Sequence, residues 1–358
     1  MPFEVLFGVV VTARFLLPLL ILRYPLPAII GCLVLDAVDQ TVFQTFGYDP
    51  PFYQGYDKAM DVFYLGVAYI SSLRNWVSLP AFKVSRFLFF YRQIGVVAFE
   101  LSQVRALLLI FPNTFEYFFI AYEAIRSRWS VARYSLRFWV GIAAFIWIVI
   151  KLPQEYWIHV AQLDFTDTVH DYWWFGPLIV VGLLVLLAIS WFVVRPRLDP
   201  VDHGWEIKAP ALPGGMDSAE KRDAWVAAHG KVISEASLEK VLLVGLLSVI
   251  FGEVLPGVTA SPLQVFVGIA VFVVINAALG IWSAGRRAGV DSVLVSFAIR
   301  LVVNFGLVGV VQLARSLTVE DYAIDVTSAI FFVFLFSVLI TLYDRYRPVY
   351  DFRRWEGS

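Results

Sequence analysis

Long runs of apolar residues, separated by short polar segments, recur along the whole chain. A helix needs about 20 mainly apolar residues to cross a bilayer. The runs that approach this length lie near residues 3–22, 26–46, 59–78, 84–100, 105–125, 138–160, 174–194, 241–256, 262–284, 292–313 and 325–343. The pattern predicts an all-α, polytopic membrane helix bundle with about eleven transmembrane helices. Residues 84–125, which hold the fourth and fifth runs, could form two spans or one bent element.

Basic residues are unequally divided between alternate loops. If the N-terminus lies outside, the inner loops hold 21 lysines and arginines, and the outer loops hold only Lys58, Arg105 and Arg315. Cytoplasmic loops of membrane proteins carry such an excess of basic residues. We therefore expect the N-terminus outside, on a first segment that is retained, and the C-terminus in the cytoplasm. Removing one span would move later basic clusters to the outer side, so the bias also favours eleven spans.

One long polar segment, residues 195–240, interrupts the apolar runs and contains several prolines and glycines before a short predicted helix. Asp217 or Ser218 could cap this helix. The expected domains are a seven-span module at 1–194, a cytoplasmic linker at 195–240, a four-span module at 241–346 and a cytoplasmic tail at 347–358. The linker is either a tether along the membrane surface or a segment that gates the protein or docks a partner.

The composition excludes several classes of protein. The chain is 59% hydrophobic and 16% charged with a net charge of −1, whereas soluble domains are about 45–50% apolar and about 25% charged. A disordered protein, a basic nucleic-acid binder and an ordinary cytosolic enzyme are therefore excluded. The single cysteine, Cys32, allows no intrachain disulfide. We expect an integral protein of a bacterial plasma membrane, in contact with lipid and open to an oligomeric or membrane partner.

Ionisable residues inside the apolar runs are the main candidate chemistry. A charge at mid-membrane costs about 2.5–3.5 kcal/mol on insertion scales, so such residues face protein or water and commonly mark ion or substrate pathways. Arg14 lies near the middle of the first run, and Asp36 and Asp39 share one face of the second. A short turn joins these two runs. We therefore predict that Arg14 pairs with Asp36 or Asp39.

Other spans add further charges. Arg92 is a plausible partner for Glu116 or Glu123, and Lys151 and Glu155 flank Pro153, which can break its helix. Arg300 shares a face with Ser296 and Asn304. The candidate substrate- or ion-binding residues are Arg14, Asp36, Asp39, Arg92, Glu116, Lys151, Glu155 and Arg300. Ion pairs that only fix helix register are the alternative interpretation of this set.

The expected outer loops are acidic and aromatic. Asp57 and Asp61 follow the second run, and Asp164, Asp167 and His170 follow the sixth. These residues could supply general-base or cation-assisted chemistry, but they lack a metal-ligand signature and are more typical of a solvated acidic loop. No metal and no cofactor is predicted, because nucleotide, zinc-protease and serine-hydrolase motifs are absent from the sequence.

The sequence favours a transporter or permease for a polar solute or ion, with a polar cavity in the first module. One alternative is an enzyme that acts on a lipid or lipid-linked substrate at the outer face. Another is a non-catalytic membrane subunit or receptor that docks through the four-span module. No catalytic residue can be assigned, and an enzymatic role is the less favoured expectation. No nucleic-acid partner is expected.

Overall fold

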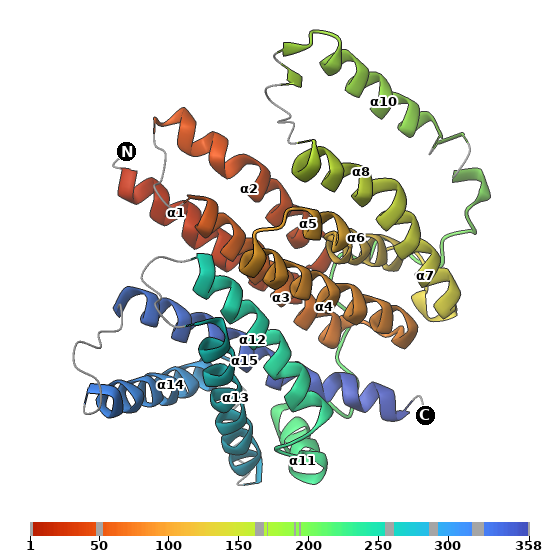
Figure 1. The fold of residues 1–358 in the computed structure, drawn as a ribbon. Coiled ribbons are helices and arrows are strands. Elements are labelled where there is room, and N and C mark those ends of the chain that lie inside the picture. Colours follow the sequence, from red (N-terminus) through yellow and green to blue (C-terminus); the bar gives the residue numbers. More distant parts are fainter. Residues whose placement is uncertain are drawn as a thin grey trace.

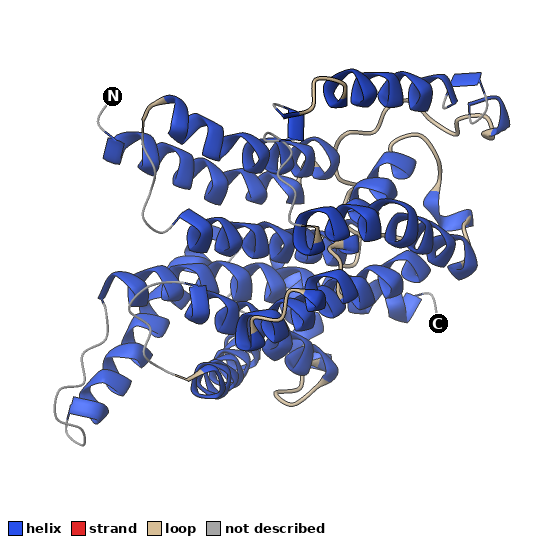
Figure 2. Cartoon of the chain, turned by 45° about the horizontal axis from the view of Figure 1, so that its top comes forward, coloured by secondary structure: helices blue, strands red, loops and turns tan. Residues whose placement is uncertain are grey.

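The architecture is helical throughout the part of the chain that can be described. The computed structural model describes residues 3–47, 53–161, 168–169, 171–189, 191–192, 195–254, 261–285, 293–316 and 326–356. These residues form helices and connecting loops and contain no strand (Figure 2). The all-α prediction is confirmed for this part of the protein.

The N-terminal half begins with a hairpin, followed by longer helices. Its elements are α1 (Phe3–Leu16), the 3-10 helix η1 (Leu17–Leu22), α2 (Pro25–Thr45), α3 (Tyr53–Asn75), α4 (Leu79–Ser102), α5 (Ala106–Ile110) and α6 (Thr114–Arg126). Pro18 cannot donate an N–H to the carbonyl of Arg14 four residues earlier, which explains why α1 tightens into η1 there. Residues 84–125 form separate helices, because α4 ends at Gln103 in a left-handed conformation.

The next segments contain the irregular helices. They are η2 (Val131–Arg133), α7 (Leu136–Phe145), the π-helix η3 (Ile146–Lys151), α8 (Leu152–Glu155), the π-helix η4 (Tyr156–Val160), α10 (Phe175–Ile189) and η6 (Arg195–Arg197). Pro153 lies in the single turn between the two π-helical segments. The predicted break at this proline is therefore a pair of widened, π-helical turns, and the helical segment continues through them.

The C-terminal part comprises α11 (Ala219–His229), α12 (Glu235–Val254), α13 (Pro262–Gly285), α14 (Val293–Ser316) and α15 (Val326–Glu356). Ser218 caps α11, because its side-chain oxygen accepts a hydrogen bond from the backbone N–H of Lys221. This is one of the two capping residues that the sequence offered.

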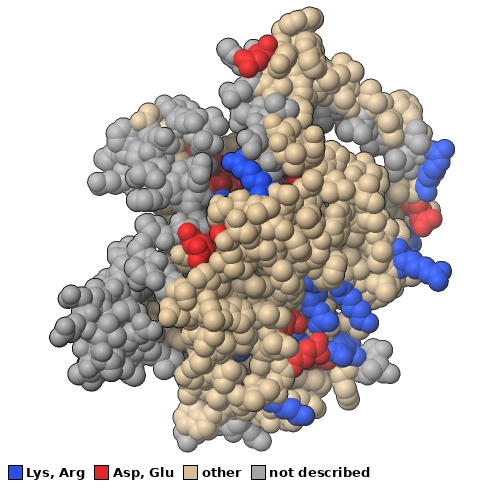
Figure 3. All heavy atoms as spheres, in the orientation of Figure 1, with Lys and Arg blue, Asp and Glu red and all other residues tan. Residues whose placement is uncertain are grey.

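Three described helices are long and apolar enough to cross a membrane. They cover Val5–Leu22, Leu136–Ile158 and Pro262–Trp282, and each matches an expected span. Most of their residues are not buried by protein, and Figure 3 shows a face of the molecule that is largely uncharged. The three helices indicate a membrane location. The expectation of eleven spans is not confirmed, since only these three helices qualify by length and composition among the described residues.

The buried core draws on both halves of the sequence. Helix α3 packs against α4, α12 and α15 (Figure 1). Tyr69 of α3 and Trp76, which directly follows it, are fully buried. Trp76 stacks on Tyr122 of α6, with ring centroids 3.7 Å apart. Large aromatic side chains dominate core energetics because each removes about 150–250 Å² from solvent. The segments on either side of the 195–240 linker thus share one core.

The linker lies against the ends of the N-terminal helices. The backbone N–H of Asp202 donates to Arg128, that of Glu206 to Ser127, and that of Ala209 to Arg23. These contacts hold the segment along one end of the bundle. It is anchored by backbone hydrogen bonds over its length rather than at its two ends alone.

Candidate functional site

Arg14 lies at the centre of four aspartates, a group we call the Arg14 cluster: Arg14, Asp36, Asp39, Asp57 and Asp61. Its terminal nitrogens lie 2.5 Å from Asp36, 2.5 Å from Asp39, 2.6 Å from Asp57 and 2.7 Å from Asp61. The predicted pairing of Arg14 with Asp36 or Asp39 is confirmed, and both carboxylates take part.

Three helices bring these residues together. Arg14 comes from α1, and the tight turn after η1 folds α2 back beside it, as an antiparallel hairpin. Asp36 and Asp39 are three residues apart on α2, and Asp57 and Asp61 are four apart on α3, so each pair shares one helix face. The sequence did not predict that the outer-face candidates Asp57 and Asp61 would join the intramembrane pair, because nothing in the periodicity relates α3 to α1.

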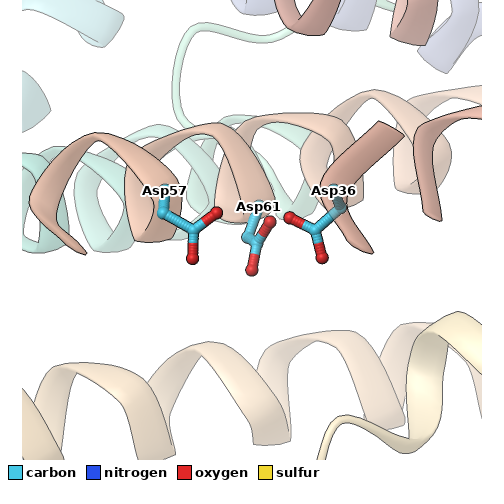
Figure 4. Close-up of side chains that lie close together, drawn as sticks. All are labelled: Asp36, Asp57 and Asp61. Carbon is cyan, nitrogen blue, oxygen red and sulfur yellow. The ribbon is translucent and has the colours of Figure 1, made fainter. Parts of the chain in front are cut away.

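The cluster is buried on one side and open on the other. The side chains of Arg14 and Asp39 are 3% and 0% exposed, whereas those of Asp36, Asp57 and Asp61 are 29%, 31% and 36% exposed. Figure 4 shows the three partly exposed side chains projecting from α2 and α3 in the same direction. With every carboxylate ionised, the cluster carries a net charge of −3.

The three partly exposed aspartates are close enough to share a cation. One carboxylate oxygen from each lies within 4.8 Å of the other two. Two oxygens bound to the same Mg²⁺ or Ca²⁺ are at most about 4–5 Å apart, since each lies about 2.0–2.6 Å from the ion. The donor set and spacing therefore fit a hard divalent cation, although no metal site was predicted from the sequence.

Polar contacts continue from the cluster into α6 and α8. Tyr64, one turn after Asp61 on α3, donates a hydrogen bond of 2.6 Å to Glu116. Glu116 also accepts from the Asn113 side chain at 2.9 Å, and the backbone N–H of Asn113 donates to Glu155 at 3.2 Å. Glu116 and Glu155, both candidates from the sequence, are thus linked through Asn113.

The contacts of Arg92 and Glu123 differ from the predicted pairing between them. Arg92 donates to the backbone carbonyl of Phe111, and Glu123 instead pairs with Arg126 at 2.6 Å, three residues along the same helix. Lys151 donates to Gln154 at 3.0 Å and lies over the ring of Tyr117. Helix α6 supplies its own cation for Glu123, which leaves Arg92 to satisfy the broken backbone between α5 and α6.

Arg300 lies in a separate group in the C-terminal part. Its guanidinium contacts Asp344 of α15 at 2.6 Å, and Lys240 of α12 contacts the other oxygen of the same carboxylate at 2.6 Å. The sequence analysis missed Lys240 and Asp344 because both lie just beyond the ends of their apolar runs. The signal that could have found Asp344 is its alignment with Ser337 and Thr341 on one face of α15.

Two cavities can be located among the described residues. Beside Arg14 there is room of about 10 Å³, on the order of one water molecule. A cavity of about 620 Å³ instead adjoins Arg300 and Lys240 in the C-terminal part. The remaining outer-face candidates, Asp164, Asp167 and His170, lie outside the described residues.

No protein-family model matches the sequence, and neither a curated protein nor a solved structure is matched by it. The role of the Arg14 cluster therefore has to be argued from its geometry and charge.

Proposed function

We propose that this chain is a polytopic membrane transporter that moves a polar solute or ion together with protons, and that the Arg14 cluster is its proton-binding site. The observation that carries this proposal is the surplus of acid around a buried base. Four aspartates contact one arginine, and three of them remain partly exposed.

The physical argument concerns the cost of like charges in a low-dielectric environment. A buried carboxylate needs a cation or several hydrogen bonds, and the effective penalty for an uncompensated one is several kcal/mol. Arg14 can neutralise one of the four. When two carboxylates share a site, one of them binds a proton more readily. The cluster is therefore suited to taking up and releasing protons, and intramembrane groups of this kind are common in proton-driven transport.

The contacts beyond the cluster supply a route for the proton. Tyr64 can both accept and donate through its hydroxyl, and it bridges the helix that carries Asp61 to Glu116. Asn113 donates amide N–H groups to both Glu116 and Glu155, and so holds the two carboxylates near each other beside the π-helical segments around Pro153. Widened π-helical turns occur frequently at functional sites. Tyr64, one turn from Asp61, is thus the group that could pass a proton between the cluster and the buried carboxylate of Glu116.

The proposal retains eleven spans with the N-terminus outside, and several contacts support that topology. Loops assigned to the inner side meet each other: Arg23 accepts from Ala209, and Trp76 accepts from Arg353. On the opposite side, Lys58 pairs with Glu100 at 3.1 Å, and both residues lie at expected outer ends. Segments on opposite sides of a bilayer could not make these contacts.

The test is proton flux in proteoliposomes that hold the purified full chain and a trapped pH-sensitive dye. The lumen contains a mixture of small sugars, amino acids and carboxylic acids, with valinomycin and K⁺ to clamp the voltage. Flux should require the mixture. Asp36→Asn, Asp39→Asn and Glu116→Gln should each reduce it by at least about tenfold, the equivalent of 1.4 kcal/mol, because each removes a proton-binding group from the path.

The matched control is Asp217→Asn, which makes the same chemical change in the linker, where Asp217 pairs with Lys221 at the surface. It should leave flux unchanged. Infrared difference spectra between low and high pH give an independent readout, since protonation of the cluster creates a carboxylic-acid band that the cluster variants lose. Normal flux in folded Asp36→Asn, Asp39→Asn and Glu116→Gln would show that these carboxyl groups have no role in transport.

A second function is favoured by one specific observation, the spacing of Asp36, Asp57 and Asp61. Three oxygens within 4.8 Å fit a divalent cation, and such an ion could polarise a phosphate of a lipid or lipid-linked substrate. Mn²⁺ titration followed by electron paramagnetic resonance tests this alternative. Tight Mn²⁺ binding that Asp57→Asn abolishes, without any proton flux, would favour the enzyme over the transporter.

A further inference from the structure

A large cavity lies in the C-terminal part, away from the Arg14 cluster. It has a volume of about 620 Å³ and is lined by residues of α11, α13, α14, α15 and the start of α12. Small-molecule sites in proteins typically have volumes of about 300–1,000 Å³. The cavity is therefore large enough for a metabolite or for a lipid headgroup.

The lining of the cavity is basic. Lysines and arginines outnumber aspartates and glutamates in it by seven to four. Lys240 and Arg300 share the single carboxylate of Asp344, each at 2.6 Å, so this trio carries one positive charge in excess. The side chain of Lys240 is 4% exposed and that of Arg300 17%. Placing two cations against one acid at this depth has a cost that an anion in the cavity would offset.

Hydrogen-bonding groups hold Arg300 toward the cavity. Asn276 of α13 accepts from the guanidinium at 3.5 Å and donates to Asn304 of α14 at 3.0 Å, and Asn304 donates to Ser337 of α15 at 2.8 Å. A methyl group built at Gly280 of α13 would lie 3.9 Å from a terminal nitrogen of Arg300, so α13 passes close to the guanidinium. Three helices thus fix the position of one arginine, as expected for a group that binds a ligand in a defined place.

The cavity also has an apolar wall, which includes Ala277, Ile281, Ile299 and Val303 of α13 and α14. Helix α13 is one of the three apolar helices that are long enough to span a membrane. Trp225 and His229 of the linker helix α11 also line the cavity. The cavity therefore runs from a charged end at the linker toward apolar surface at the level of the membrane.

We propose that this cavity binds a phosphate-bearing anion, with the phosphate between Lys240 and Arg300 and the rest of the ligand along the apolar wall. Arginine and lysine are the usual phosphate-binding side chains. An anionic phospholipid and a soluble phosphate compound both present this chemistry. The proposal does not depend on the proposed transport function, because it involves another part of the chain.

The experiment measures the thermal unfolding midpoint of the full chain in detergent, with added phosphatidylglycerol, phosphatidylcholine or inorganic phosphate. A ligand that binds the folded state raises the midpoint, and the rise grows with the logarithm of the ligand concentration once this exceeds Kd. Phosphatidylglycerol, inorganic phosphate or both should raise it, and phosphatidylcholine should not. A response to phosphatidylglycerol alone identifies a lipid headgroup, and a response to inorganic phosphate identifies a soluble source.

Two variants change the charge of the site in opposite directions. Arg300→Gln removes the excess charge, keeps Asp344 paired with Lys240, and should reduce the affinity at least about tenfold, as for the loss of one charge-assisted hydrogen bond. Asp344→Asn leaves both cations and should increase the affinity. The matched control, Arg133→Gln, removes an exposed arginine that pairs with Asp202, and it should respond as the wild type does.

Either of two results overturns the proposal: neither phosphatidylglycerol nor inorganic phosphate raises the midpoint of the wild type, or Arg300→Gln responds as strongly as Arg133→Gln. If Arg300→Gln fails to fold, Asp344→Asn decides, since an unchanged or weaker response in that variant contradicts an anion site beside Asp344.

Discussion

Arg14 shows how a single side chain can organise several helices. Its guanidinium carries five donors in a planar fork, and it contacts carboxylates from both α2 and α3. The sequence was sufficient to pair Arg14 with α2, because a short turn forces antiparallel packing. It was not sufficient to bring in Asp57 and Asp61, since the choice of third helix depends on packing that no local pattern encodes.

Removing the guanidinium should therefore destabilise the protein strongly. Arg14→Gln leaves four carboxylates without their cation, and breaking a buried ion pair on one side typically costs about 3–5 kcal/mol. We expect a large fall in the thermal unfolding midpoint in detergent at pH 7.

The Arg14→Gln/Asp39→Asn double variant provides the control. Removing the fully buried acid together with the base should recover part of the lost stability, so the two effects should not add. Strict additivity of the two midpoint shifts would mean that Arg14 and Asp39 do not interact in the folded protein.

A second group of ion pairs, at the start of α12, predicts that the stability of the protein depends on pH. Glu235 lies before the expected span at 241–256, and hydrogen bonds from Arg86 at 2.9 Å and Arg354 at 3.1 Å lower the pKa of its carboxyl group. A carboxyl group whose pKa is lower in the folded than in the unfolded protein stabilises the fold at a pH above its unfolded-state pKa, about 4.3 for glutamate. This stabilisation is lost as the pH falls through the folded-state pKa. Because Glu235 is half exposed, the contribution should stay below about 1 kcal/mol.

Wild type and Glu235→Gln should accordingly differ in unfolding midpoint at pH 7 and converge as the pH falls below about 4. Glu220→Gln, which removes an exposed carboxylate from α11, serves as the comparison. A difference between wild type and Glu235→Gln that stays constant over this pH range would contradict the assigned ion pairs.

Helix boundaries followed the sequence where a single residue type determines them. Ser218 caps α11, and Pro18 tightens the end of α1. The sequence left open whether residues 84–125 form one element or two, because apolar periodicity continues through the break. In the structure these residues form separate helices that pack against each other, and Gly95 of α4 lies against Phe111, which follows α5. A contact of this kind depends on the path of the chain, and the sequence shows only that a glycine is present.

Gly95→Ala tests this packing. A methyl group at position 95 would overlap the side chain of Phe111, and overpacking of a tight contact typically costs about 1–3 kcal/mol. We expect a lower unfolding midpoint. Gly141→Ala in α7 is the matched control, because nothing lies within 4 Å of its new methyl group and alanine favours a helix over glycine by about 1 kcal/mol. Equal responses of the two variants would show that α4 does not approach Phe111.

The organisation of the whole molecule was only partly predictable. Composition and apolar periodicity were enough to indicate a helical membrane protein, since both are properties of the chain itself. The division into modules at 195–240 was an interpretation of a polar segment, and the core nevertheless joins α3 to α12 and α15. Tyr69 donates to Glu239 of α12, which in turn contacts Arg347 of α15. Such contacts between distant segments arise from tertiary packing that hydrophobic patterns do not specify.

The topology itself gives the last prediction. In a Cys32→Ala background, Lys208→Cys places a thiol in the expected inner linker and Thr259→Cys places one in an expected outer loop. Cys32 is buried, so its removal should cost little more than a small packing defect. A membrane-impermeant maleimide applied to intact cells should label Thr259→Cys, and it should label Lys208→Cys only after lysis. Labelling of both in intact cells would place the two segments on one side, and would exclude an odd number of spans between them.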